Sequence, residues 1–113
     1  MALRPFFANV RQVTDAAIID LHGEIHGQAE YALNEAYAGA TATNPATVVL
    51  NFTDVDYINS TGIALIVGLL AQARKSRRHL RVYGLSDHYV EIFQITRLAD
   101  FMHIFANEAS ALI

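Results

Sequence analysis

The sequence predicts an α/β fold in which a mixed sheet of about four to five strands is covered by helices. Strand-like apolar runs alternate with helix-like segments, and this alternation begins only after two successive strand-like runs. Each strand–helix–strand crossover places two strands parallel and leaves its helix on one face of the sheet. The 113 residues, 53% of them hydrophobic, are the size of one domain that can bury a core, so we expect a single domain over residues 1–113.

The first half of the chain is expected to contain a hairpin, a helix and a buried strand. Two strand-like runs separated by Thr14 and Asp15, a tight turn, indicate the hairpin. A segment rich in Ala and Leu, with its apolar residues on one helical face, predicts the helix, and Asn44-Pro45 marks the turn into an apolar run. These elements are expected at residues 6–13, 16–23, 29–40 and 46–52.

Polar residues separate the buried strand from a long apolar helix that begins near Gly62. Polar side chains end strands, form turns and cap helices, so a loop is expected here, with Asn59, Ser60 or Thr61 as the N-cap. A serine at this place lies at the positive end of the helix macrodipole, beside unpaired backbone N–H groups that favour a phosphate group. The spacing alone favours the interpretation of Ser60 as a cap.

The second half of the chain is expected to continue the alternation. The cations in residues 74–78 suit the negative end of the central helix, and they are interpreted as its solvated C-terminus. An alternating run closed by Gly84 predicts a strand, and Ser86 with Asp87 begins a third helix. The expected elements are a strand at 80–84, a helix at 86–94, a strand at 101–105 and a turn of helix within 106–113.

Three segments resemble those of a known family. The turn at residues 59–62, Asn-Ser-Thr-Gly, resembles the Asp-Ser-Ser-Gly or Asp-Ser-Thr-Gly signature of the STAS domain, the fold of bacterial anti-sigma factor antagonists. Gly-Glu-Ile at residues 23–25 is similar to the family's Gly-Glu-Leu, and residues 80–86 are similar to its fourth strand and the turn that follows. The resemblance implies a STAS-like sheet, and it matches Ser60 to the serine that a partner serine kinase phosphorylates in the family's regulated members.

The sequence departs from the family pattern at three positions. His26 stands where members that are kinase substrates often carry Asp, and Asn59 stands where Asp commonly precedes the phosphorylated serine. Arg97 occupies a position before the last strand where many members have Gly. The first two departures each remove a carboxylate, and they bear on recognition by a kinase.

A partner-binding surface is expected around the start of the central helix. If Ile63, Ile66, Val67 and Leu70 face the sheet, Leu65 and Leu69 lie on a neighbouring face by their i, i+4 spacing. That strip either is exposed for a partner or is covered by the third helix. The expected partner-binding residues are Glu24, His26, Asn59, Thr61, Gly62, Leu65 and Leu69.

The sequence offers no pattern for catalysis, a cofactor or a metal, and we expect none of these. It lacks the Gly-x-Ser-x-Gly elbow and the nucleotide-binding Gly-rich loop, and it has no cysteine. His22 and His26 have the spacing of a helical metal pair, but the glycines beside them argue against a helix. Asp54 and Asp56 are expected to cap the strand end rather than hold a cation.

The net charge and the hydropathy pattern also limit the kinds of partner and the location that we expect. A net charge of −3 argues against nucleic acid, because a binding module of this size usually carries a basic excess. Residues 1–5 lack a signal-peptide pattern, and the longest apolar run is much shorter than the ~20 residues of a membrane helix. We therefore expect a soluble, cytoplasmic protein without direct membrane insertion.

The resemblance implies a non-enzymatic switch protein. It would bind an anti-sigma factor or serine kinase-type partner and be switched by phosphorylation at Ser60. The alternative is a cytoplasmic STAS subunit of a membrane transport complex, similar to the small component of phospholipid ABC importers, in which the same surface docks on a permease or ATPase. A third, weaker hypothesis is a phosphate or nucleotide binder.

Overall fold

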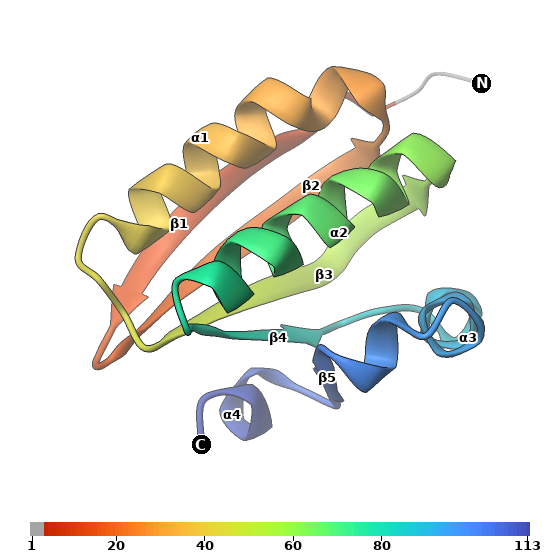
Figure 1. Ribbon diagram of the computed structural model, residues 1–113. Coiled ribbons are helices and arrows are strands. Elements are labelled where there is room, and N and C mark those ends of the chain that lie inside the picture. The colour runs from red at the N-terminus through yellow and green to blue at the C-terminus, as the bar shows by residue number, and fades with distance from the viewer. Residues whose placement is uncertain (1–3) are drawn as a thin grey trace.

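The computed structural model describes residues 4–113 and contains a five-stranded mixed sheet in the order β1-β2-β3-β4-β5 (Figure 1). β1 runs antiparallel to β2, and the remaining neighbours are parallel. The expected hairpin and crossovers are thereby confirmed. The strands are β1 Phe7–Val13, β2 Ala16–Ile25, β3 Thr47–Ile58, β4 His79–Tyr83 and β5 His103–Phe105, and the helices are α1 Glu30–Thr41, α2 Ser60–Lys75, α3 Asp87–Ile95 and α4 Glu108–Ala111, with 3₁₀ turns at Gly27–Ala29 and Leu98–Asp100.

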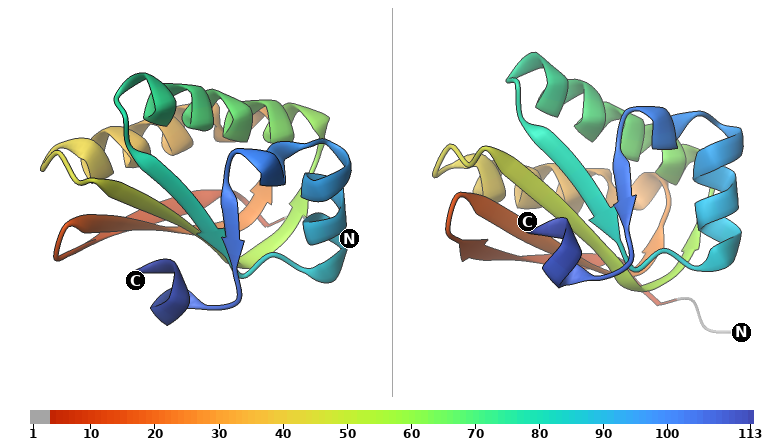
Figure 2. Two further views of the ribbon diagram at one scale, coloured as in Figure 1. Left: turned by 60° about the horizontal axis from the view of Figure 1, so that its bottom comes forward. Right: turned by 90° about the horizontal axis from the view of Figure 1, so that it is seen from below.

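Helices cover the two faces of the sheet unequally. α1 and α2 lie on one face and α4 on the other (Figure 2). Because side chains alternate along a strand, Ile19, Leu50 and Val82 face the large core under α1 and α2, whereas Ile18 and Val49 face a small cluster under α4. Beyond α4, this second face carries polar side chains, among them Asn9, Asp20 and His22, and Phe7 stacks on His22 there.

The signal-peptide expectation falls partly on residues 1–3, which lie outside the described residues. Within residues 4–113, no helix has both the length and the apolar character needed to cross a membrane.

β3 is longer than expected, and the predicted loop after Phe52 is wrong. The strand continues through polar residues to Ile58, because β2 is equally extended and pairs Glu24 with Tyr57 and Ile25 with Ile58. Polar residues in this stretch face solvent and are therefore compatible with a strand whose partner strand holds it in place. The turn into α2 is consequently reduced to Asn59.

The expected orientation of α2 is wrong at two positions. Leu69 is 1% exposed and belongs to the core, whereas Val67 is 43% exposed. The cause is Gly62, where an added Cβ would lie 2.1 Å from the Ile25 carbonyl oxygen. This close approach turns the Gly62 side of the helix toward β2, and the buried positions follow at helical spacing, namely Ile66, Leu69, Leu70 and Ala73.

Arg97 adopts a left-handed backbone conformation with φ of 68°. This conformation suits glycine, the residue that the resembling family often has at this position. The Arg97 Nε donates a hydrogen bond to Asp100 at 2.5 Å, within the turn that leads to β5. The departure from the family pattern therefore keeps the backbone geometry and adds a local ion pair.

Candidate functional site

The first turn of α2 is capped by Asn59, not by Ser60. The Asn59 Oδ1 accepts a hydrogen bond from the Gly62 amide at 2.8 Å, and the Asn59 amide donates to the Ile25 carbonyl at 3.2 Å. An aspartate could accept the same capping bond, so Asn59 preserves the helix start while removing one negative charge. The interpretation of Ser60 as the cap is wrong.

Ser60 is the first residue of α2, and its side chain is exposed. Among residues 4–113, no side-chain hydrogen bond engages its hydroxyl within the molecule. The hydroxyl is therefore available to a partner or a modifying enzyme. A phosphate group added here would lie at the positive end of a helix of 16 residues.

An open, mainly apolar groove of about 420 Å³ lies between the start of α2 and α3. The Tyr89 hydroxyl accepts a hydrogen bond from the Ile58 amide at 2.9 Å, and this bond joins α3 to the end of β3 beside Ser60. Ser60 thus belongs to the wall of a surface built from three elements. The lining residues are Tyr57, Ile58, Asn59, Ser60, Ile63, His88, Tyr89, Ile92 and Thr96.

The end of β2 lies next to this helix start. Ile25 pairs with Ile58, and its carbonyl accepts from Asn59, so Glu24 and His26 flank the same edge. The His26 Nδ1 accepts a hydrogen bond from the Gln28 amide at 3.1 Å, which caps the 3₁₀ turn as an aspartate would. Glu24 is 9% exposed, and its Oε2 has no hydrogen-bond partner among the described residues. An incoming donor at this oxygen would therefore be stabilising.

The structure brings together most of the residues predicted for partner binding. Glu24, His26, Asn59 and Thr61 lie at one end of the sheet, around Ser60. The remaining three are covered to different degrees: Gly62 is buried against β2, Leu65 is half-buried and Leu69 is buried in the core. Leu69 cannot contact a partner directly, so its expected role is wrong.

Sequence reasoning missed the contribution of α3 to the groove. The sequence predicts no binding role for Tyr57, His88, Tyr89 and Ile92, because their place beside Ser60 depends on how α3 packs against the end of β3. A signal was present at Tyr57, an aromatic residue just before the polar turn. Its place beside Ser60 follows from the extension of β3 to Ile58.

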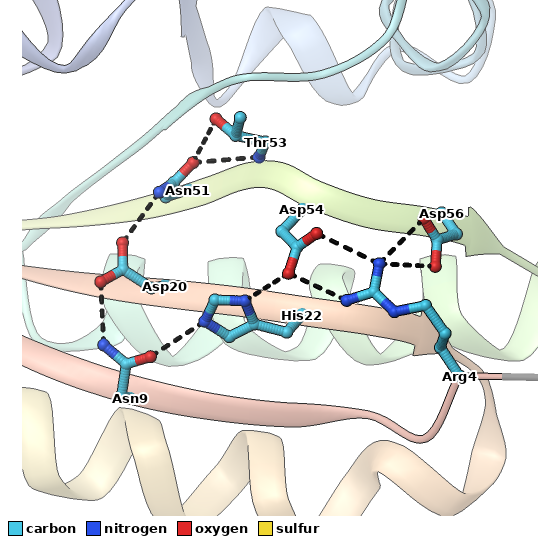
Figure 3. Close-up of polar contacts among 8 residues, drawn as sticks. All are labelled: Arg4, Asn9, Asp20, His22, Asn51, Thr53, Asp54 and Asp56. Atoms are coloured by element: carbon cyan, nitrogen blue, oxygen red, sulfur yellow. Dashed lines mark hydrogen bonds and ion pairs between the residues drawn. The ribbon is translucent and has the colours of Figure 1, made fainter.

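A polar network crosses the open face of the sheet (Figure 3). Arg4 lies 2.9 Å from a carboxylate oxygen of both Asp54 and Asp56, and the His22 Nδ1 lies 2.7 Å from Asp54. Hydrogen bonds from Arg4 and His22 lower the pKa of Asp54 to about 2. Asp54 and Asp56 are thus held by Arg4, in place of the strand-end capping that was expected.

Asp20 is the centre of the second half of this network. Arg11, Asn9 and Asn51 donate hydrogen bonds to it at 2.7 to 2.9 Å, and they lower its pKa to about 2. Arg11 also donates to Glu108, which joins the network to α4. Across the described chain, no group of three His, Asp or Glu side chains is placed to ligate a metal ion.

Comparisons with known proteins agree with this architecture. The family model of the STAS domain matches residues 7–111. The anti-sigma-B factor antagonist of Listeria monocytogenes is 31% identical over 91 residues, which cover 80% of each chain. That of Staphylococcus aureus is 37% identical over 57 residues, 50% of this chain and 53% of the relative.

Solved structures share the fold at lower sequence identity. An anti-sigma factor antagonist from Mycobacterium paratuberculosis superposes with a TM-score of 0.82 and 18% identity, covering 96% of this chain and 92% of that one. The unphosphorylated form of SpoIIAA superposes with a TM-score of 0.74 and 21% identity, covering 93% and 92%. The match over residues 7–111 and the relatives of similar length lead to one conclusion: the chain belongs to the STAS domain family.

Proposed function

We propose that this chain is an anti-sigma factor antagonist that binds an anti-sigma factor and is switched by phosphorylation at Ser60. The observation that carries the proposal is an exposed serine, free of any capping role, beside an open apolar groove. The names of the similar proteins from Listeria and Staphylococcus support the class of partner. The proposal also includes a serine kinase that phosphorylates Ser60.

The geometry explains how one phosphate would act. Phosphorylation adds about −1.5 to −2 charges and three acceptor oxygens, which the N-terminus of α2 accommodates without rearranging the fold. A partner seated in the groove would have to desolvate that dianion. Without a pairing arginine on the partner, the cost is several kcal/mol, enough to dissociate a micromolar complex.

Two acidic variants and one neutral variant test the proposal by titration calorimetry against the anti-sigma factor encoded in the same genome. Ser60→Asp is expected to weaken binding, and Ser60→Ala to bind as the unmodified protein does. Ser76→Asp adds the same charge at the other end of α2, and it should leave affinity unchanged. Equal binding by Ser60→Asp and Ser60→Ala would show that the charge at Ser60 has no switching role.

The second candidate function is a subunit of a membrane transport complex. A sulfate transporter family protein from Wolinella succinogenes shares the fold, with a TM-score of 0.74 and 13% identity over 90% of this chain and 86% of that one. The same groove would then dock on a permease or ATPase, and phosphorylation would not be needed. A gene for an ABC permease beside this one, in place of an anti-sigma factor gene, would favour that function.

A further inference from the structure

Positive charge is concentrated at the end of α2 that lies away from Ser60. Five of the chain's eight Lys and Arg residues fall here, and we call them the cationic pole: Arg74, Lys75, Arg77, Arg78 and Arg81. The other three, Arg4, Arg11 and Arg97, each form an ion pair. Within residues 4–113, no Asp or Glu side chain lies within ion-pair distance of any residue of the cationic pole. Arg81 is the member engaged within the described chain, because its Nη1 donates hydrogen bonds to the Ala111 and Ile113 carbonyl oxygens at 2.8 Å.

Two hollows meet at Arg78. One, of about 400 Å³, lies between the C-terminal ends of α1 and α2, and the other, of about 290 Å³, lies between α2, β4 and the segment before β5. Among residues 4–113, no Asp or Glu lines either hollow, although the chain has 11 of them. The first is lined by Asn34, Tyr37, Ala38, Thr41, Gln72, Lys75, Ser76 and Arg78, and the second by Leu70, Arg74, Arg78, His79, Leu80, Arg81, Phe101 and His103.

Hydrogen-bond donors at this place lack acceptors. The Arg78 Nε is buried and has no partner among the described residues, while its Nη2 donates to Asn44 at 2.9 Å. The Tyr37 side chain, 6% exposed, likewise has a buried hydroxyl without a partner in that part of the chain. Burial raises the pKa of Tyr37, which keeps the hydroxyl protonated and able to donate. Unpaired buried donors are unfavourable, and an acceptor-rich ligand would satisfy them.

A solvated helix C-terminus explains only part of this cluster. The negative end of α2 accounts for Arg74 and Lys75, since cations are favoured in the last turn. It does not account for Arg78, which lies beyond the helix, is half-buried and lines both hollows. Lys75 lines the first hollow, Arg74 lines the second, and Arg78 lines both, so the three cations border adjoining hollows that meet at Arg78.

We propose that the cationic pole binds a phosphate group through Arg74, Lys75 and Arg78. A phosphate presents several anionic acceptors, and the planar fork of a guanidinium matches its geometry. The group can belong to a free small molecule or to a lipid headgroup, since both present the same chemistry. α2 is about 24 Å long, so this site and Ser60 lie at opposite ends of one helix (Figure 1).

Two probes distinguish the two sources. Inorganic phosphate is titrated into the full chain and followed by NMR amide shifts, and vesicles of phosphatidic acid in phosphatidylcholine are tested by cosedimentation, with pure phosphatidylcholine as the control. Arg78→Gln and Arg74→Gln are each expected to weaken binding about tenfold or more. Arg74 is exposed, so its substitution keeps the test valid if Arg78→Gln fails to fold.

Arg77→Gln is the matched control, because it removes the same charge from the same segment but lines neither hollow. It is expected to bind both probes nearly as the wild type does. Phosphate binding that depends on Arg74 and Arg78 supports a small-molecule ligand, and binding to the acidic vesicles alone supports a headgroup. The proposal would be overturned if the protein bound neither probe. It would also be overturned if Arg77→Gln lost as much affinity as Arg74→Gln and Arg78→Gln, since that result would indicate diffuse electrostatic attraction without a defined site.

Discussion

At the start of α2, Asn59 caps the helix and the neighbouring Ser60 presents an exposed hydroxyl. Asn59 accepts the capping hydrogen bond from Gly62, so Ser60 is left exposed. A change at Ser60 can therefore alter the charge of the surface without removing the cap. This division is the residue-scale basis of the proposed switch.

A kinase that acts on this protein is expected to modify Ser60 and leave Thr61 unmodified. The Thr61 Cγ2 lies close to Gly27, 3.5 Å from where a Cβ would stand, whereas Ser60 lines the open groove. Mass spectrometry after incubation with the kinase and ATP measures the site. Modification at Thr61 alone would remove Ser60 from the mechanism.

Gly62 and Gly68 form a matched pair for a stability test. Gly62→Ala places a Cβ against the Ile25 carbonyl and is expected to lower the free energy of unfolding by about 1–3 kcal/mol. Gly68 lies in the same helix, and a Cβ added there would have no neighbouring atom within 4 Å. Gly68→Ala should therefore raise the free energy of unfolding by about 0.5–1 kcal/mol. Urea denaturation measures both, and equal effects would contradict the packing assigned to Gly62.

At the scale of elements, the groove depends on the contact between α3 and the end of β3. Tyr57 is 49% exposed and lines this groove. Tyr57→Ala is expected to weaken binding of the anti-sigma factor by about 2 kcal/mol or more, as expected for an aromatic hot spot, with little change in melting temperature. Titration calorimetry and thermal denaturation measure the two effects.

Tyr31 provides the control for this substitution. It is 76% exposed on α1 and does not line the groove. Tyr31→Ala should leave partner affinity unchanged. An equal loss of affinity in both variants would mean that the partner does not use the groove.

The order of elements could be predicted from the sequence because each has a local signal. Apolar runs, the Ser86 cap and the turn at Asp15, with its positive φ, all act over a few residues. The extension of β3 could not be predicted, because Asp54 and Asp56 have weak strand propensity. They become a strand only because β2 pairs with them.

The candidate site could be predicted only where its residues are neighbours in the sequence. Ser60 and Asn59 are identified by a contiguous motif, whereas the orientation of Leu69 depends on a backbone contact between Gly62 and Ile25. α2 is apolar on most of its circumference, so hydrophobicity alone could not select its buried side. The polar network on the open face was also missed, since it joins residues of three strands (Figure 3).

At the scale of the whole molecule, this network makes stability depend on pH. The pKa of Asp20 falls from 3.8 to about 2 on folding, so its stabilising contribution is complete above pH 3.8 and is lost as the pH falls toward 2. Asp20 is 8% exposed, and the contribution is about 2 kcal/mol. Urea denaturation across this range should show the loss.

Asp20→Asn should lower the free energy of unfolding at neutral pH and make its decline in acid shallower. Asp15→Asn removes the same charge at the exposed hairpin turn, and it should keep the wild-type slope. A slope that is the same for Asp20→Asn and the wild type would mean that Asp20 does not anchor the network.

The central claim concerns the whole molecule in complex with its partner, and the phosphorylated protein tests it most directly. Protein phosphorylated at Ser60 and unmodified protein are titrated into the anti-sigma factor under the same conditions, after circular dichroism has shown whether the fold is retained. We predict an unchanged spectrum and an affinity lower by about two orders of magnitude or more, because the partner must desolvate a dianion at the rim of the groove. Equal affinities of the two forms would contradict the proposed switch.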